Sequence, residues 1–274
     1  MAEAFHALGN TVVIAGRRAG PLEAVAAAHP GMMAAVLDVA DAGALRAFAG
    51  RAAKDYPALN VLIDNAGIVQ TEDGMAEPFD MATYEATVAI NLVAPIRLAM
   101  ALLPQLRRQA RAAVVNVTSG PAFVPRAVTP TYGATKAAMP SRTQSMRQQL
   151  RGTAVQMIEL VPPLVATDLT PGQRDNPRTM PLDAFIRESM ALFAADDGAA
   201  EIPVERVKPQ RGAEARLLLP VHDELLFEVP DGGGGQGGPG GEGGDGGGGG
   251  DFRAAGGGDR DWGDLGGRAL EAVP

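Results

Sequence analysis

Short apolar runs alternate with longer segments of helical character along the first part of the chain. The apolar runs lie at residues 11–15, 33–37, 60–63, 113–117 and 153–160, and they predict strands. These runs are largely continuous rather than apolar at every second position, which is typical of strands buried on both faces. The segments between them predict helices over 21–29, 42–55, 82–108 and 131–151. This alternation predicts an α/β fold, a doubly wound parallel sheet with helices on both sides.

The helix boundaries carry local signals. Asp41 is placed to cap the helix at 42–55. Residues 2–8 predict the last turns of another helix, with Gly9 as its C-cap. A sheet of this type normally has a strand before its first helix, so we expect the chain to begin inside a helix.

Glycine changes the picture at the C-terminal end. Of the 274 residues, 231–274 hold 21 of the 35 glycines and, by residue count, −5 of the formal net charge of −8. A segment that is nearly half glycine cannot bury enough apolar surface to offset its ordering entropy, so we expect a disordered tail. The remaining chain is long enough for one sizeable core.

Composition excludes several classes of protein. The chain has no cysteine, which excludes disulfides, thiolate metal sites and cysteine nucleophiles. His6, His29 and His222 lack metal-ligand spacing, so we expect no metal site. No apolar run approaches the roughly 18–20 residues of a membrane span, and the N-terminus lacks the basic region of a secretory signal. We therefore expect a cytoplasmic protein without a membrane or nucleic-acid partner.

Three side chains predict carbonyl chemistry. Tyr132 and Lys136 lie four residues apart, on one face of the predicted helix. An ammonium close to a phenol lowers the phenol's pKa, which suits a tyrosine that protonates a carbonyl oxygen. Ser119 follows a predicted strand, where ligands of open α/β sheets bind. Alone, the tyrosine–lysine pair is also compatible with a half-buried tyrosine beside a surface lysine.

Further segments give this pair its context. They are Asp38-Val39, Asn65-Ala66-Gly67, Asn91, Asn116-Val117-Thr118-Ser119, Tyr132 to Lys136, and Pro162-Pro163-Leu164-Val165-Ala166-Thr167. In order and spacing, residues 2–215 resemble the short-chain dehydrogenase/reductase family, whose fold is Rossmann-like. The run from Met180 to Lys208 is similar to the C-terminal helix and strand of one bacterial branch of these oxidoreductases.

The resemblance implies a role for each matched residue. It implies Tyr132 as the general acid and base, Lys136 as the residue that lowers its pKa and holds the nicotinamide ribose, and Ser119 as the residue that orients the substrate carbonyl. It implies that Asn91 holds a proton-relay water. It implies a cofactor site formed by Asp38, Val39, Asn65, Ala66, Gly67, Lys136 and Thr167. Asn91 is also compatible with an exposed polar group, Asp38 with a turn, and Thr167 with a helix cap.

The cofactor preference rests on the end of the first predicted strand. Gly16, Arg17 and Arg18 stand where an acidic residue would bind a ribose 2′-hydroxyl. An arginine accommodates a 2′-phosphate instead, so we predict NADP rather than NAD, with an ordinary basic turn as the alternative.

The sequence departs from the family pattern at its start. The resemblance implies a strand and a glycine-rich, pyrophosphate-binding turn before residue 2, and neither is present. That strand would lie between those at 11–15 and 60–63, so we expect two open central edges. We therefore interpret the chain as an N-terminally truncated or mis-started reading frame.

Three residues depart within the matched region. Pro140 lies inside the predicted helix at 131–151, where we expect a kink that costs about 3 kcal/mol or more. Arg142 stands where that helix is expected to face the core, and Asp64 replaces the asparagine that usually precedes Asn65.

Residues 216–230 carry a second resemblance. The run Arg216-Leu217-Leu218-Leu219-Pro220-Val221-His222-Asp223-Glu224-Leu225-Leu226-Phe227-Glu228-Val229-Pro230 resembles the metal-binding strand-turn-strand of family A DNA polymerases. There the aspartate matched by Asp223 helps to hold metal ions. No second carboxylate motif accompanies it, as two-metal chemistry needs, and a chance acidic hairpin is the alternative.

We thus divide the chain into an oxidoreductase-like domain (1–215), a hairpin fragment (216–230) and a glycine-rich tail (231–274). The main hypothesis is an NADP-dependent enzyme acting on a small carbonyl or alcohol substrate. The alternatives are a non-catalytic remnant and, more distantly, a polymerase fragment. The resemblance also implies a homodimer or homotetramer.

Overall fold

The computed structural model describes residues 1–78, 80–195, 199–204, 216–218, 226–228 and 268–272. The strands are β1 (Thr11–Gly16), β2 (Met33–Val36), β3 (Leu59–Asp64), β4 (Ala112–Val117), β5 (Val155–Val161), β6 (Glu201–Pro203), β7 (Arg216–Leu218), β8 (Leu226–Glu228) and β9 (Arg268–Ala272). The helices are α1 (Ala2–Ala7), α2 (Ala19–Ala28), α3 (Ala42–Asp55), α4 (Met81–Val88), α5 (Ala94–Leu106), α6 (Pro130–Gln149) and α7 (Leu182–Ala195), with a π-helical turn η1 (Ala89–Val93) and a 3-10 turn η2 (Gly120–Ala122).

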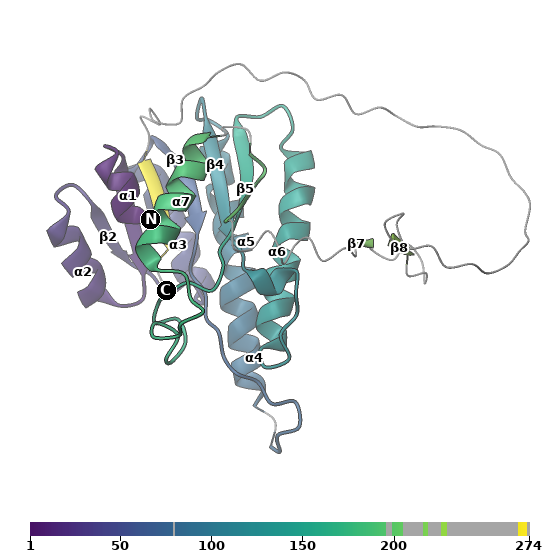
Figure 1. The fold of residues 1–274 in the computed structure, drawn as a ribbon. Coiled ribbons are helices and arrows are strands. Elements are labelled where there is room, and N and C mark those ends of the chain that lie inside the picture. The colour runs from purple at the N-terminus through teal and green to yellow at the C-terminus, as the bar shows by residue number, and fades with distance from the viewer. Residues whose placement is uncertain (79, 196–198, 205–215, 219–225, 229–267, 273–274) are drawn as a thin grey trace, which may run out of the picture.

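One sheet organises the domain. Its strand order is β2-β1-β9-β3-β4-β5-β6, and all six neighbouring pairs are parallel. Side chains from α3, α5 and α6 pack on one face, and side chains from α1, α2 and α7 pack on the other. Figure 1 shows the sheet between these two layers of helices. Every residue of β3 and β4 is buried, as their continuous apolar runs predict. The predicted Rossmann-like, doubly wound α/β fold is confirmed.

The predicted helix boundaries are close to those observed. The Asp41 side chain caps α3 by accepting hydrogen bonds from the backbone N–H groups of Gly43 at 2.7 Å and Ala44 at 3.0 Å. Gly9 follows α1 with φ of +85°, a conformation that glycine adopts without strain. The segment before β1 is helical, as its sequence predicts.

The middle of the sheet corrects one expectation. Instead of two open central edges, β9 lies between β1 and β3 and pairs in parallel with both (Figure 1, yellow strand). Leu270 is the register partner of Val13 on one side and of Leu62 on the other. A strand from the far end of the sequence therefore satisfies backbone groups that would otherwise be unpaired. It also means that residues 268–272 of the predicted disordered tail form a strand.

The predicted helix over 82–108 is interrupted. The chain passes from α4 through the π-helical turn η1 into α5, and such turns are frequent at functional sites. By length and composition, Met81–Leu106 is apolar enough to cross a membrane, contrary to our reading of the sequence. Buried residues of α5 such as Leu98 and Leu102 pack into the core beside β3 and β4, which accounts for its apolar character.

The remaining C-terminal predictions are only partly covered. β7 and β8 pair antiparallel, while the turn that contains Asp223 lies outside the described residues. The resemblance to a polymerase hairpin therefore stays a prediction. Except for β9, the glycine-rich tail also lies outside the described residues.

Candidate active site

The carboxyl ends of the strands meet at one edge of the sheet because all the strands run in the same direction. Gly16 of β1 pairs with Val36 of β2, and Asp64 of β3 pairs with Asn116 of β4. The loops that follow these strands carry the sequence-predicted cofactor residues and Ser119. Helix α6 begins beside this edge and carries Tyr132 and Lys136 on buried positions. The fold therefore brings the predicted catalytic group together.

Tyr132 is the central side chain of this group. It is 8% exposed, and its phenol is hydrogen-bonded to the Ser119 side chain. Burial raises the pKa of Tyr132, while the bond to Ser119 and the charge of Arg126 lower it by less. This corrects our expectation that Lys136 lowers the pKa of Tyr132. The phenol is neutral at pH 7 and can donate a proton.

Lys136 lies beneath Tyr132 rather than on the surface. Its Nζ donates a hydrogen bond to the backbone carbonyl of Val117 at 2.8 Å and lies 5.8 Å from the centre of the Tyr132 ring. Burial lowers the pKa of Lys136 to about 8, and the carboxyl of Asp64 partly opposes this shift. The ammonium therefore donates to the backbone carbonyl of the last residue of β4.

Asn91 lies in η1 and is buried, not exposed. Its Nδ2 donates to the carbonyl of Ile68 and its Oδ1 accepts from the N–H of Ile68, both at 2.8 Å. A Cβ added at Gly67 would lie 3.3 Å from Asn91 Oδ1 and 3.8 Å from Lys136 Nζ. Asn91 therefore ties the loop after β3 to the long helix, and Gly67 lets that loop approach the lysine closely.

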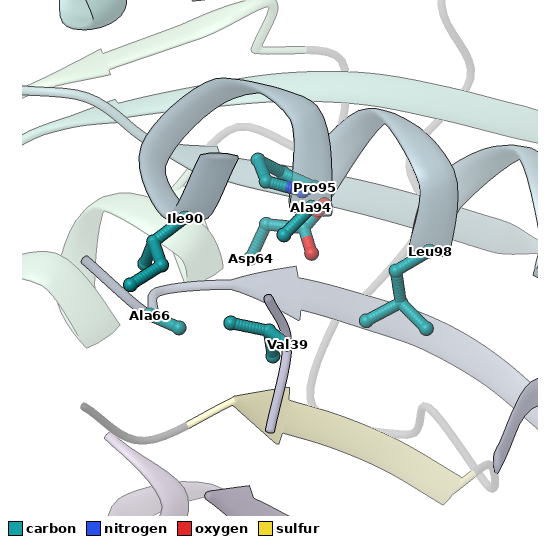
Figure 2. A pocket seen from close by; sticks show the side chains of 7 residues that line it. All are labelled: Val39, Asp64, Ala66, Ile90, Ala94, Pro95 and Leu98. Carbon is teal, nitrogen blue, oxygen red and sulfur yellow. The ribbon is translucent and has the colours of Figure 1, made fainter. Parts of the chain in front are cut away.

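The adenine-side residues are arranged differently. Asp38 is exposed and accepts a hydrogen bond from the Ala40 N–H at 2.9 Å, so it does form the turn that we considered as an alternative. Val39 is buried in the core, where it lines a small cavity with Ala66 (Figure 2). Thr167 caps no described helix; its hydroxyl accepts from the Gln173 side chain at 3.2 Å. These residues follow the carboxyl ends of the strands, as the resemblance implies, and these contacts are with other residues of the chain.

A large cavity opens beside the end of β1. It has a volume of about 1060 Å³ and is lined by residues of α1, β1, α2 and α7. Arg17 and Arg18 line it, together with Arg174 and Arg187. Arg174 is paired with Asp168, and Arg187 is paired with Asp183 across one helical turn. Glu3 and Asp183 also line the cavity, so the cations that favour an anionic ligand there are Arg17 and Arg18 at the end of β1.

One anchoring residue was not found from the sequence. Glu72, in the loop after β3, accepts hydrogen bonds from the hydroxyl of Thr131 at 2.7 Å and from its backbone N–H at 3.2 Å. Its negative charge lies at the N-terminus of α6, where it is stabilised by the helix dipole. It fixes the residue next to Tyr132. No local sequence signal marks Glu72, because the two segments lie 59 residues apart.

Comparison with known proteins agrees with this geometry. Residues 1–178 match the family described as short chain dehydrogenase. An uncharacterized oxidoreductase of Bacillus subtilis, DltE, is 37% identical over 216 residues, which cover 78% of this chain and 85% of that protein. The 2,3-dihydro-2,3-dihydroxybenzoate dehydrogenase of Escherichia coli is 29% identical over 203 residues, which cover 72% and 78%.

Solved structures show the same fold. A short-chain dehydrogenase of Sphingobium yanoikuyae in complex with NADPH has a TM-score of 0.68 at 24% identity, over 77% of this chain and 86% of that one. A closed serine dehydrogenase complexed with NADP+ has a TM-score of 0.67 at 20% identity, over 81% and 94%. The family match over residues 1–178 and the Bacillus relative establish that the chain belongs to the short-chain dehydrogenase family.

Proposed function

We propose that this chain transfers hydride between NADP(H) and a small carbonyl or alcohol substrate. The observation that carries the proposal is the buried phenol of Tyr132, hydrogen-bonded to Ser119 and stacked above Lys136. A neutral, buried phenol next to a hydroxyl is suited to protonate a carbonyl oxygen as it gains charge.

Each residue of the candidate site has a separate role in the proposed reaction. Tyr132 donates its proton to the substrate oxygen, and Ser119 donates a hydrogen bond that orients that oxygen. Lys136 supports the phenol from below and is the residue that would hold the nicotinamide ribose. Asn91 fixes the loop that carries Asn65 and Gly67. The bound cofactor would supply the hydride, and the protein supplies position and electrostatics.

NADP is favoured by the cavity beside β1. Its side chains fit a dinucleotide carrying an additional phosphate, because Arg17 and Arg18 line it and no acidic residue stands at the end of β1. The two solved structures above hold NADP+ or NADPH, which supports the same choice by analogy. We place the enzyme in the cytoplasm, as a homodimer or homotetramer.

A second candidate is a remnant that keeps the catalytic group but does not bind cofactor. It is favoured by residues 1–10, which contain one glycine, Gly9, so these ten residues themselves supply no glycine-rich turn for a pyrophosphate. The truncated or mis-started reading frame stays a hypothesis. A stop codon just upstream of Met1, with no such turn encoded after it, would argue against a mis-assigned start.

Titration with NADPH distinguishes the two candidates. Binding followed by nicotinamide fluorescence should saturate at micromolar cofactor, whereas no saturation at millimolar cofactor supports the remnant. Arg17→Glu should weaken NADPH binding at least about tenfold and leave NADH binding unchanged, because it removes a charged hydrogen bond to phosphate. Arg107→Glu, an equal charge change on an exposed helix end, is the matched control.

Turnover tests the chemistry separately. With a panel of aldehydes and ketones, Tyr132→Phe should lower the rate of NADPH oxidation by about 100-fold or more. The NADPH affinity of this variant should be unchanged. Equal rates for wild type and Tyr132→Phe would exclude the proposed acid.

A further inference from the structure

A buried carboxyl without a local partner lies beneath the catalytic group. Asp64, the last residue of β3, is 8% exposed, and its Oδ2 has no hydrogen-bond partner among the described residues. A buried carboxyl is costly unless it is protonated or compensated by an opposite charge. Asp64 is not one of the residues to which the proposed reaction gives a role.

The η1–α5 segment on one side of Asp64 presents apolar side chains to its carboxyl and no opposite charge. Figure 2 shows the carboxyl between β3 and the η1–α5 segment, with Ile90, Ala94, Pro95 and Leu98 around it. The cavity there has a volume of about 10 Å³, at the lower limit for one water molecule, which needs two to four polar partners. Asp64 is the one polar side chain that lines it. Any counter-charge must therefore come from another element.

Helix α6 supplies two cations on the other side. Burial raises the pKa of Asp64 to about 8, and Arg142, followed by Lys136, opposes that shift. Lys136 already donates to the Val117 carbonyl. Arg142 has a buried Nη1 with no hydrogen-bond partner among the described residues. Its guanidinium is therefore the donor that remains available to the buried acceptor of Asp64.

A neighbouring hydrogen bond holds the two elements together. Asn116, the register partner of Asp64 on β4, donates from Nδ2 to the hydroxyl of Thr143 at 2.8 Å. Thr143 is the residue after Arg142 on α6. The Oδ1 of Asn116 is also buried and has no hydrogen-bond partner in the described part of the chain. Two unpartnered acceptors and one unpartnered donor thus belong to one small region where β3, β4 and α6 meet.

The sequence departs from the expected residue at both of these positions. Asp64 stands where this family usually has asparagine, and Arg142 stands where the helix is expected to be apolar. We propose that Arg142 is the internal counter-charge of Asp64 and that the two, with Asn116, form a buried cluster that positions Lys136 from beneath. The pairing itself is independent of turnover; its effect on Lys136 rests on the proposed function of that residue.

The cluster predicts a specific pattern of energetic coupling. In a double-mutant cycle with Asp64→Asn and Arg142→Leu, the effects of the two substitutions on the free energy of unfolding should not add: Arg142→Leu should cost more when Asp64 is present than when asparagine stands in its place. At pH 9, where Asp64 is ionised, the coupling should reach about tenfold in the unfolding equilibrium constant. At pH 6, where the carboxyl is protonated, it should be smaller.

A matched control uses Gln144→Leu, an exposed position on the same helix, combined with Asp64→Asn. These two should be additive within about twofold. If Arg142→Leu does not fold, Arg142→Lys and Arg142→Gln replace it, and the charged variant should be the more stable of the two. Coupling below about twofold at both pH values, or equal stability of Arg142→Lys and Arg142→Gln, overturns the pairing.

The positioning role has its own readout. The pH dependence of Lys136 acylation by acetic anhydride, followed by mass spectrometry, reports the protonation of that amine. Asp64→Asn should move the Lys136 midpoint down by about one pH unit, because a carboxylate that favours the ammonium is removed. The midpoint of Lys54, on α3, should stay unchanged. An unmoved Lys136 midpoint would refute the positioning role even if the pairing holds and even if the chain binds no NADPH.

Discussion

The two halves of the sheet are built in different ways. In the catalytic half, β3, β4 and β5 follow one another in the chain, and the helices that cover them lie between them in sequence. In the cofactor half, β1 and β2 are joined to the rest through β9, which comes from the opposite end of the sequence. The catalytic half is therefore assembled from consecutive segments, whereas the cofactor half depends on one long-range pairing.

The halves also differ in how their side chains are held. Tyr132, Lys136 and Asn91 are buried, and each is bonded to a named partner. Arg17 and Arg18 are exposed beside an open cavity. The proposed catalytic group is thus preorganised by its neighbours, whereas the groups expected to meet the cofactor phosphate are exposed. Local assembly and preorganised chemistry occur together in this protein.

The largest effect should come from breaking the strand that joins the halves. A central strand has every backbone N–H directed at a neighbour, so Leu270→Pro removes a ladder hydrogen bond and should cost about 3 kcal/mol or more. Hydrogen exchange should rise in β1 and β3 but less in β4 and β5. Leu217→Pro, in the separate β7–β8 pair, should leave the exchange of the large sheet unchanged. Identical exchange for the two variants would show that β9 does not join the halves.

The stability of the catalytic half should rise when the proline inside α6 is replaced. Helix α6 stays helical from Pro130 to Gln149 with Pro140 inside it. The proline ring lacks an N–H and crowds the carbonyl of Lys136, so Pro140→Ala should raise stability by up to about 3 kcal/mol. Thermal unfolding measures this, with the neighbouring exposed Ser141→Ala as control. An unchanged melting temperature would mean that the helix accommodates the proline without cost.

Loosening the loop after β3 should have an intermediate effect. Asn91→Ala removes two hydrogen bonds to the backbone of Ile68 and should cost about 2 kcal/mol in the free energy of unfolding. Because the loop approaches Lys136, activity should fall more than NADPH affinity. Asn91→Asp, which keeps the acceptor but loses the donor, should fall between wild type and Asn91→Ala. Full stability of Asn91→Ala would refute the tie between loop and helix.

The smallest effect, counted per pH unit, should be a pH dependence of the free energy of unfolding that arises in the catalytic half. The pKa of Asp64 is about 8 in the folded protein, against an ordinary value of 3.8. Protonated Asp64 therefore adds its full contribution to the free energy of unfolding below pH 3.8, and this contribution is lost as the pH rises to about 8. Lys136 has a folded pKa of about 8 against 10.5, so stability rises again above 8. Denaturant unfolding should show a minimum near pH 8, with slopes of at most about 1.4 kcal/mol per pH unit. In Asp64→Asn, the loss of unfolding free energy as the pH rises to about 8 should disappear. A loss as large as that of the wild type would show that other groups cause it.

The sequence by itself determined the elements and the edge of the sheet at which the candidate catalytic residues meet. Continuous apolar runs specify the strands, and β3 and β4 are buried on both faces as expected, whereas β2, at the edge of the sheet, is not. The spacing of Tyr132 and Lys136 places both on one face of α6. Family motifs identified Ser119 and Asn91, although the sequence could not show that the Asn91 side chain is hydrogen-bonded to the backbone of Ile68. These features depend on neighbours within a few residues, which is why a single sequence shows them.

Only the tertiary structure decided what joins distant segments. Nothing in residues 268–272 predicts that they pair with β1 and β3, because pairing depends on which edges the rest of the fold leaves open. The raised pKa of Tyr132 follows from burial, which the pattern of residues does not measure. Asp64 and Arg142 were visible as departures, but their common location arises where β3 and α6 meet in space. Charge and burial act through distance in three dimensions, and the sequence does not fix that distance until the chain has folded.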